Sequence, residues 1–354
     1  MENGNKNIVT IGGGTGSYTI LMGIKNILDI NISAIVAMTD DGGSTGVLRD
    51  ELGVLPAGDV RQCLIALSEE SDVVRKLMSY RFEDGALAGH NFGNIFLAGL
   101  EKVSGSFSSG VEEASKVLKI KGKVLPVINQ KATLCAELKN GILLKGENDI
   151  NHYDLGNVGI HKLYIEAKEE SENKSKNNLT RKDGLDNNFI NSIEINPHAQ
   201  KAILEADYIL VGPGNHYCSV LPALAVHGVS DAIQNTKAKI IYISNLTNKK
   251  GHTLHFKVSK YVTEIESYIN KKLDYIIINS ESPTDEQVKH YELVEGDGVL
   301  VLDDMHDDCR VIRSSLLSHK INIQNKTDKI SDMRSFIRHD SDKIKIVLEN
   351  IIQS

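Results

Sequence analysis

The chain has 354 residues, of which 41% are hydrophobic and 25% charged, and its formal net charge is −7. This composition is typical of a globular protein large enough for one α/β domain or two smaller ones. The negative charge argues against general nucleic-acid binding, and no apolar run reaches the roughly 20 residues needed to cross a bilayer. The polar N-terminus enters a strand almost at once, so we expect no signal peptide and a cytoplasmic protein.

The first predicted junction is a β-branched strand over residues 7–11 that runs into a glycine loop and then a helix to about Leu28. Glycine lets a ligand approach bare backbone N–H groups, and the start of a helix favours a phosphate. A plain strand–helix turn is the alternative, but a second glycine loop follows one βα unit later. The predicted ligand-binding residues of this first loop are Gly12, Gly13, Gly14, Thr15 and Gly16.

The second glycine loop follows a predicted buried strand over residues 32–38. Carboxyl ends of neighbouring parallel strands meet at one edge of a sheet, so both loops are expected to line one crevice. The loop aspartates allow three interpretations: hydrogen bonding to a ribose, holding a divalent cation against a diphosphate, or capping the next turn. Spacing does not choose between ribose and cation. The predicted ligand-binding residues here are Asp40, Asp41, Gly42, Gly43, Ser44 and Thr45.

A proline–glycine turn then leads into a predicted helix over residues 60–67. Asp59 either caps this helix or faces the crevice, and with Asp40 it is our predicted ligand pair for Mg²⁺. Arg61 lies in the first helical turn, where the helix dipole disfavours a cation. We therefore consider a phosphate contact for Arg61, with a solvated side chain as the alternative.

The segment 89–94 precedes another apolar helix, over residues 95–100. Its two asparagines, Asn91 and Asn94, are suited to a base edge or a sugar hydroxyl, and equally to capping the helix. His90 is a candidate general acid or base, with a structural role as the alternative.

The pattern changes between residues 105 and 160. Short predicted strands over residues 123–128, 133–138 and 141–144 indicate an antiparallel excursion beside the main sheet, with Glu147 as an edge charge. Residues 166–188 are rich in Glu, Lys, Asn and Ser and are interpreted as a flexible surface insertion.

A third strand–glycine junction follows the strand predicted over residues 206–211. It contributes the candidate ligand-binding residues Gly212, Gly214, Asn215 and Tyr217, and a strand over residues 239–243 adds Asn245. Alternating strands and helices predict an α/β fold: a Rossmann-like, doubly wound, mostly parallel sheet with a small antiparallel excursion. We expect a single domain over residues 1–320, including a late strand at 299–302, and a helical tail over 321–354 with a helix at 342–352.

Taken together, the motifs resemble the CofD/YvcK superfamily, and most closely its bacterial gluconeogenesis-factor branch. The matching segments lie in family order over nearly the whole chain: residues 11–16, 39–67, 80–82, 89–94, 212–217 and 337–340. The resemblance implies a nucleotide-binding Rossmann-like fold. It further implies UDP-sugar binding and control of cell shape or the cell wall during growth on gluconeogenic carbon. A relative branch instead transfers a phospholactyl group with a divalent metal.

The chain departs from the family pattern in two places. Asn215, His216 and Cys218 replace the usual residues of the third loop, and the segment 247–253 replaces a usual Gln and Gly-Glu-Thr. Both departures fall where the sugar or acceptor end of a ligand is expected.

Three functions are compatible with these features. A UDP-sugar-binding regulatory protein without an assigned catalytic residue comes first, and a Mg²⁺-dependent transferase of phospho-groups comes second. A nicotinamide-dependent oxidoreductase comes last, because the first loop lacks the GxGxxG spacing. The expected partners are a small-molecule nucleotide sugar, a second copy of the chain, and regulatory proteins of metabolism or the cell wall.

Overall fold

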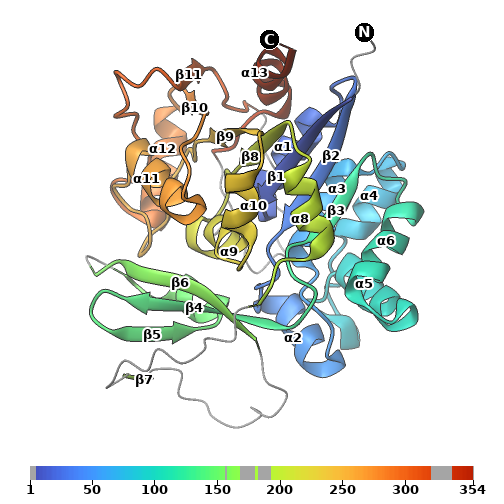
Figure 1. Cartoon of the computed structure of the whole chain (residues 1–354). Helices are drawn as coiled ribbons and strands as arrows, with labels where there is room; N and C mark the ends of the chain where they lie inside the picture. The colour runs from blue at the N-terminus through green and yellow to red at the C-terminus, as the bar shows by residue number, and fades with distance from the viewer. Residues whose placement is uncertain (1–4, 156–157, 168–179, 182–192, 320–336, 354) are drawn as a thin grey trace.

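The computed structural model describes residues 5–155, 158–167, 180–181, 193–319 and 337–353. Its main element is a seven-stranded sheet in which every neighbouring pair is parallel (Figure 1). From one edge to the other, the strands are β11 (Val311–Ser314), β10 (Tyr275–Asn279), β9 (Lys239–Ile243), β8 (Tyr208–Val211), β1 (Lys6–Gly12), β2 (Ile30–Val36) and β3 (Lys123–Pro126).

The strand order reverses beside β1. The chain proceeds outward from β1 through β2 to β3, returns to β8 on the other side of β1, and then proceeds outward through β9 and β10 to β11. This is the Rossmann-like, doubly wound arrangement predicted from the sequence. In such sheets a ligand binds beyond the carboxyl ends of the strands at the reversal point, here between β1 and β8.

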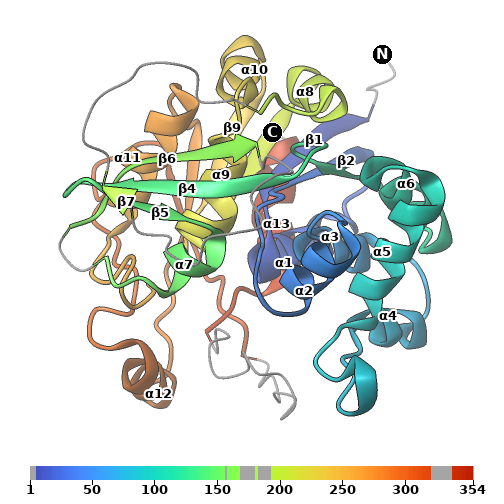
Figure 2. The same cartoon turned by 90° about the horizontal axis from the view of Figure 1, so that it is seen from below.

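The central strands are buried because helices cover both faces of the sheet. Ile8, Val9 and Ile11 of β1 are each 1% exposed, which explains why the strand is largely apolar in the sequence. On one side of the sheet lie α1 (Gly14–Ile24), α3 (Gly58–Leu67) and α13 (Ser341–Gln353), and on the other lie α8 (Pro197–Leu204) and α10 (Val229–Asn235) (Figure 2).

The C-terminal helix α13 is part of the main core. It packs against α1, and its residues Ile344, Val347 and Leu348 belong to the same buried cluster as β1. The predicted helix at 342–352 is therefore present, and its apolar face lies against α1. The segment 320–336 before it is outside the described residues.

The remaining helices fall into two groups. Beside β3 lie α2 (Gly43–Leu52), α4 (Asp72–Ser79), the short 3₁₀ turn η1 (Gly85–Leu87), α5 (Phe92–Ser104) and α6 (Phe107–Val117). In the other half lie the π-helical turn η2 (His216–Val220), α9 (Leu221–Leu224), α11 (Val258–Ile269) and α12 (Asp285–Glu295). None of the helices described is both long and apolar enough to span a membrane.

A smaller antiparallel sheet lies beyond the carboxyl ends of the main strands (Figure 1). Its order is β6 (Ile160–Ala167), β4 (Ala132–Leu138), β5 (Ile142–Lys145) and β7 (Thr180–Arg181), and the helix α7 (Glu147–His152) follows β5. The predicted antiparallel excursion is thus confirmed for its second and third strands.

Two strand predictions were wrong. The segment beginning at Lys123 does not join the small sheet, because β3 pairs in parallel with β2 after a long helical crossover. Residues 299–302 form only isolated bridges, from Leu300 to Thr247 and from Leu302 to Lys257, and the last strand of the sheet is β11. Most of the predicted insertion at 166–188 lies outside the described residues.

Candidate functional site

The loops that follow β1 and β8 touch each other at the reversal point of the sheet. A β-carbon at Gly16 would lie 2.0 Å from the carbonyl oxygen of Pro213, so only glycine permits this approach. A β-carbon at Gly214 would lie 3.6 Å from the Gly13 carbonyl oxygen, which is an ordinary van der Waals distance. The Asn245 side chain, from the loop after β9, donates to the Gly214 carbonyl oxygen at 2.8 Å. Three of the predicted loops therefore converge.

The loop after β2 joins the same cluster through Asp40. The Asp40 carboxylate accepts a hydrogen bond from the backbone N–H of Gly42 at 2.9 Å. Its other oxygen lies 2.7 Å from the position of a β-carbon at Gly58, the first residue of α3. Helix α2 begins at Gly43 without a side-chain cap, so its first N–H groups are open to a ligand. We call these convergent segments, residues 12–16, 40–46, 57–59 and 212–215, the glycine-loop cluster.

Asp59 faces the glycine-loop cluster and does not cap a helix. Helix α3 begins two residues earlier than predicted, with Ala57 as its N-cap, so the capping alternative for Asp59 is wrong. The Asp59 carboxylate lies so close to Gly13 that a β-carbon there would be 1.9 Å from an oxygen, and it accepts a hydrogen bond from the Gly14 backbone. A carboxylate thus occupies the start of α1, where the sequence predicted a phosphate.

Carboxylates crowd this part of the structure. Burial, reinforced by the charge of Asp40, raises the pKa of Asp59 to about 7. Burial also raises the pKa of Asp40. The pKa of Glu147 is raised well above its ordinary value, by burial first and then by the neighbouring aspartates. Glu147 lies at the start of α7 with an oxygen 3.4 Å from the Thr39 hydroxyl, so its interpretation as an edge charge was wrong.

Asp41 is directed toward α7. Its carboxylate accepts a hydrogen bond from the Asn148 backbone N–H at 2.6 Å and lies 4.0 Å from the Arg49 guanidinium. Asp41 therefore links the loop after β2 to the small antiparallel unit.

The donor chemistry at Asp40 and Asp59 suits a hard divalent cation. Within the described ranges, no group of three or more His, Cys, Asp or Glu side chains is placed to hold a metal ion. Mg²⁺, however, is commonly bound by one or two carboxylates together with substrate phosphates and water. Burial raises the pKa of both carboxyl groups, and the charge of Asp40 adds to the shift at Asp59. Both fit that requirement, because a cation beside them would favour their ionised forms.

Arg61 is buried beneath the cluster. It is 9% exposed, donates from Nε to Asn94 Oδ1 at 2.9 Å, and also bonds the Met78 carbonyl oxygen. The solvated alternative is therefore wrong. Asn94 in turn donates to the Thr45 hydroxyl at 3.2 Å, so this chain of contacts supports the loop after β2 from below.

The segment 89–94 packs against the same loop. Ser44 Oγ lies 3.2 Å from His90 Nδ1 and accepts a hydrogen bond from the Asn91 backbone. The Asn91 side chain caps α5 by accepting from the Asn94 backbone N–H. The capping alternative is thus realised for Asn91, and His90, half-buried, is placed at the edge of the glycine-loop cluster.

The polar side chains of the third loop point in two directions. Asn215 donates to Asn151 Oδ1 of α7 at 3.1 Å, on the side of the cluster. Tyr217 is 4% exposed, and its hydroxyl points to Glu264 of α11 at 3.3 Å. His216 also bonds Glu264, at 2.9 Å, and this buried pairing anchors η2. Tyr217 is therefore directed away from the glycine-loop cluster, toward α11.

Three residues of this region were missed. Glu147 and Asn151 belong to α7, and Lys249 follows β9. Nothing local in the sequence marks α7 as a neighbour of the glycine loops. Lys249, however, lies in the segment 247–253 that departs from the family pattern.

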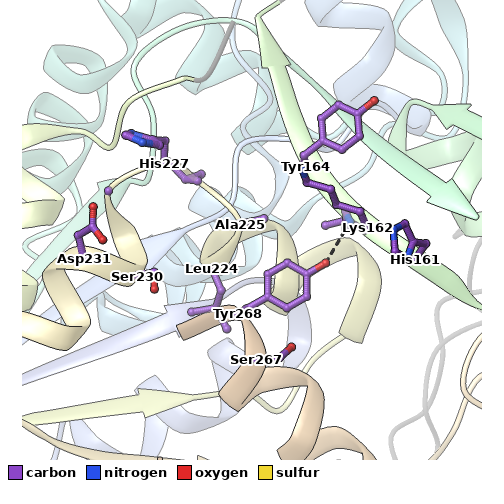
Figure 3. A pocket seen from close by; sticks show the side chains of 13 residues that line it. His161, Lys162, Tyr164, Leu224, Ala225, His227, Ser230, Asp231, Ser267 and Tyr268 are labelled. Carbon is purple, nitrogen blue, oxygen red and sulfur yellow. Dashed lines mark hydrogen bonds between the residues drawn. The ribbon is translucent and has the colours of Figure 1, made fainter. Parts of the chain in front are cut away.

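A separate hollow of about 440 Å³ lies between β6 and the helices α9, α10 and α11 (Figure 3). Its lining includes Lys162, Tyr164, His227 and Asp231, and the Tyr268 hydroxyl accepts a hydrogen bond there from the Leu163 backbone at 3.0 Å. None of the predicted ligand-binding residues lines this hollow.

Comparisons with known proteins cover almost the whole chain. The family model described as 2-phospho-L-lactate transferase CofD matches residues 8–317. A gluconeogenesis factor of Bacillus subtilis is 32% identical over 350 residues, which span 98% of both chains. A Thermotoga maritima relative is 36% identical over 346 residues, spanning 97% of this chain and 98% of that one. A solved structure from Bacillus halodurans, described as a member of the UPF0052 family, has a TM-score of 0.80 and 30% identity and covers 97% of this chain and 98% of that one.

Proposed function

The chain belongs to the CofD family, in the branch whose members are named gluconeogenesis factors, and we propose that it is a regulatory protein that binds a UDP-sugar. The observation that carries the proposal is the convergence of the glycine loops after β1, β2 and β8 at the reversal point of the sheet. Bare backbone N–H groups at such a point favour the diphosphate of a nucleotide.

The carboxylates of Asp40 and Asp59 affect how a diphosphate could be bound. A phosphate placed beside Asp40 and Asp59 would be repelled if both were ionised, and burial already opposes their ionisation by raising both pKa values. We therefore propose that Mg²⁺ is bound with the nucleotide, with these two residues as its protein ligands. When bound, the ion would neutralise both the carboxylates and the diphosphate.

The chain's own residues have distinct tasks in this proposal. The open start of α2 would donate N–H groups to a phosphate, and Ser44 would place His90 at the edge of the ligand. Arg61 and Asn94 would keep the loop after β2 in place from beneath. Asn245 would hold the loop after β8 through the Gly214 carbonyl.

A phospho-group transferase is the second candidate. It is favoured by the family model's description and by Asp59, whose pKa of about 7 suits a group that gains and loses a proton near neutral pH. The named relatives favour the regulatory function. Release of UMP or transfer of a phospho-group to an acceptor, dependent on Mg²⁺ and on Asp59, would favour the transferase.

Calorimetric titration tests the proposal directly. We expect saturable binding of UDP-glucose or UDP-N-acetylglucosamine in the presence of Mg²⁺, and much weaker binding in EDTA. Asp59→Asn should remove most of the Mg²⁺ dependence, whereas Glu51→Gln, an exposed carboxylate on α2, should not. Absence of binding by every uridine nucleotide would overturn the proposal, and mass spectrometry of a co-purified ligand would give an independent answer.

The resemblance to the gluconeogenesis-factor branch supports a proposal for the biological role. We propose that the protein acts in the cytoplasm and influences cell shape or the cell wall during growth on gluconeogenic carbon, through partner proteins or a second copy of the chain. A deletion strain with normal growth and shape on such a carbon source would contradict this role while leaving the binding proposal intact.

A further inference from the structure

Among the described residues, Lys249 holds a positive charge beside the glycine-loop cluster with only neutral hydrogen-bond partners. It follows β9 and is half-buried. Its Nζ donates to the backbone carbonyl oxygen of Asn151 at 3.3 Å and to the Asn151 side-chain oxygen. Its backbone N–H donates to the Thr253 hydroxyl at 2.9 Å, which holds the main chain at Lys249 in place.

Within the described residues, Lys249 makes no ion pair. The carboxylates whose charge acts on the Lys249 ammonium are those of Glu295 and Glu147, and each has another partner. Glu295 accepts a hydrogen bond from the Lys250 backbone at 2.7 Å, and Glu147 lies beside the Thr39 hydroxyl. Burial lowers the pKa of Lys249, as expected for an ammonium group removed from water without a counter-charge. An incoming anion would supply the missing charge.

The contacts of Lys249 connect it with the loop after β8, at one end of the expected ligand. Asn151 Oδ1, which Lys249 contacts, also accepts from Asn215 at 3.1 Å and lies 3.6 Å from Cys218 Sγ. Asn215 directly follows the loop that meets Gly13. The ammonium is therefore linked to Asn215 of the glycine-loop cluster through one amide side chain, that of Asn151 on α7.

We propose that Lys249 makes the site selective for a nucleotide sugar whose sugar carries a carboxylate, which the ammonium would bind. This inference rests on the proposed function and specifies its ligand class. The diphosphate is assigned to the glycine loops, so the group that extends from it past Asn215 is the sugar. A carboxylate there would exchange the contact of Lys249 with a neutral amide for a charge-assisted hydrogen bond.

His252 does not compete for this role. It is 8% exposed, and its pKa is lowered to about 4, by burial first and then by the charge of Lys249. The imidazole is therefore neutral near pH 7, and Lys249 carries the positive charge of this pair.

A matched pair of ligands tests the inference: UDP-glucuronate and UDP-glucose differ only by a carboxylate in place of a hydroxymethyl group. We expect the wild-type protein to bind UDP-glucuronate about tenfold more tightly in the presence of Mg²⁺, because a hydrogen bond to a charged group is worth about 1.5 kcal/mol or more. Lys249→Met should abolish the difference by weakening UDP-glucuronate alone. Lys250→Met, which removes an exposed neighbouring charge, should leave it unchanged.

Several outcomes would overturn the inference. Equal affinities in the wild-type protein would do so without any variant. An equal loss of both ligands in Lys249→Met would show that the ammonium acts on the diphosphate. The melting temperature of a second variant, Lys249→Gln, controls for a folding defect. Binding of neither ligand would instead remove the proposed function, and this inference with it, whereas equal binding removes the inference alone.

Discussion

Replacing Asp59 with asparagine should stabilise the ligand-free protein, and increasingly so as the pH rises. The carboxyl group of Asp59 has a pKa of about 7 in the folded chain and an ordinary value of 3.8. The folded state therefore binds the proton more tightly than the unfolded state. For a group of this kind, stability falls as pH rises through the interval between the two values, here from about 4 to about 7.

The size of the effect follows from the shift. A difference of about three pKa units corresponds to a limiting cost of about 4 kcal/mol above pH 7, at 1.36 kcal/mol per unit. Of this cost, about 2.5 kcal/mol develops between pH 5 and pH 8. With an unfolding entropy of about 2.1 cal/mol/K per residue, a chain of this length would show a change of about 3 °C in melting temperature.

The assay is thermal unfolding followed by circular dichroism at pH 5 and pH 8, in EDTA and without nucleotide. Asp59→Asn keeps an oxygen that can accept from the Gly14 backbone, so it removes the charge and little else. The melting temperature of the variant should exceed that of the wild type by about 3 °C more at pH 8 than at pH 5. Glu51→Gln is the control for an exposed carboxylate.

If the variant and the wild type differed in melting temperature by the same amount at pH 5 and at pH 8, the reasoning would be refuted. That result would mean that Asp59 is ionised in the folded chain at pH 5. Addition of Mg²⁺ should reduce the pH dependence of the wild type, since the cation favours the ionised carboxylate. Persistence of the full dependence in saturating Mg²⁺ would argue against Asp59 as a metal ligand.

Three further changes test other parts of the structure. Gly16→Ala should destabilise the chain by about 1–3 kcal/mol in chemical denaturation, because the added β-carbon meets a carbonyl oxygen. Gly99→Ala should stabilise the chain by up to about 1 kcal/mol, because Gly99 lies in α5 with open space around it. Changes of the same sign in both variants would contradict this prediction. Glu264, paired with His216, has its pKa lowered to about 2 against an ordinary 4.5. Its contribution of up to about 3 kcal/mol should be present above pH 4.5, be lost as pH falls toward 2, and be absent in Glu264→Gln, as denaturant titrations at pH 3 and 7 would show. Asn245→Ala should weaken UDP-sugar binding about fivefold in calorimetry, and unchanged affinity would exclude its role in holding the third loop.

The sequence alone determined the central strands of the main sheet and the places where its ligand loops begin. Strand formation depends on local periodicity, which is why β9 was predicted at its observed boundaries. Glycine at the end of an apolar strand is also a local signal, and it identified the loops after β1 and β8. Their meeting follows from the topology rule for parallel sheets, so convergence was predictable too.

Tertiary structure decided which side chains share the site. The carboxylate of Asp59 lies against Gly13 because α3 packs on α1, and the sequence indicates neither that packing nor the resulting pKa. Glu147 comes close to Asp40 only because the small antiparallel unit folds over the carboxyl ends of the main strands. Lys249 contacts Asn151 across about a hundred residues of chain. Periodicity and turn chemistry act over a few residues, whereas burial and charge depend on every neighbour in space, and those neighbours are fixed only when the elements pack.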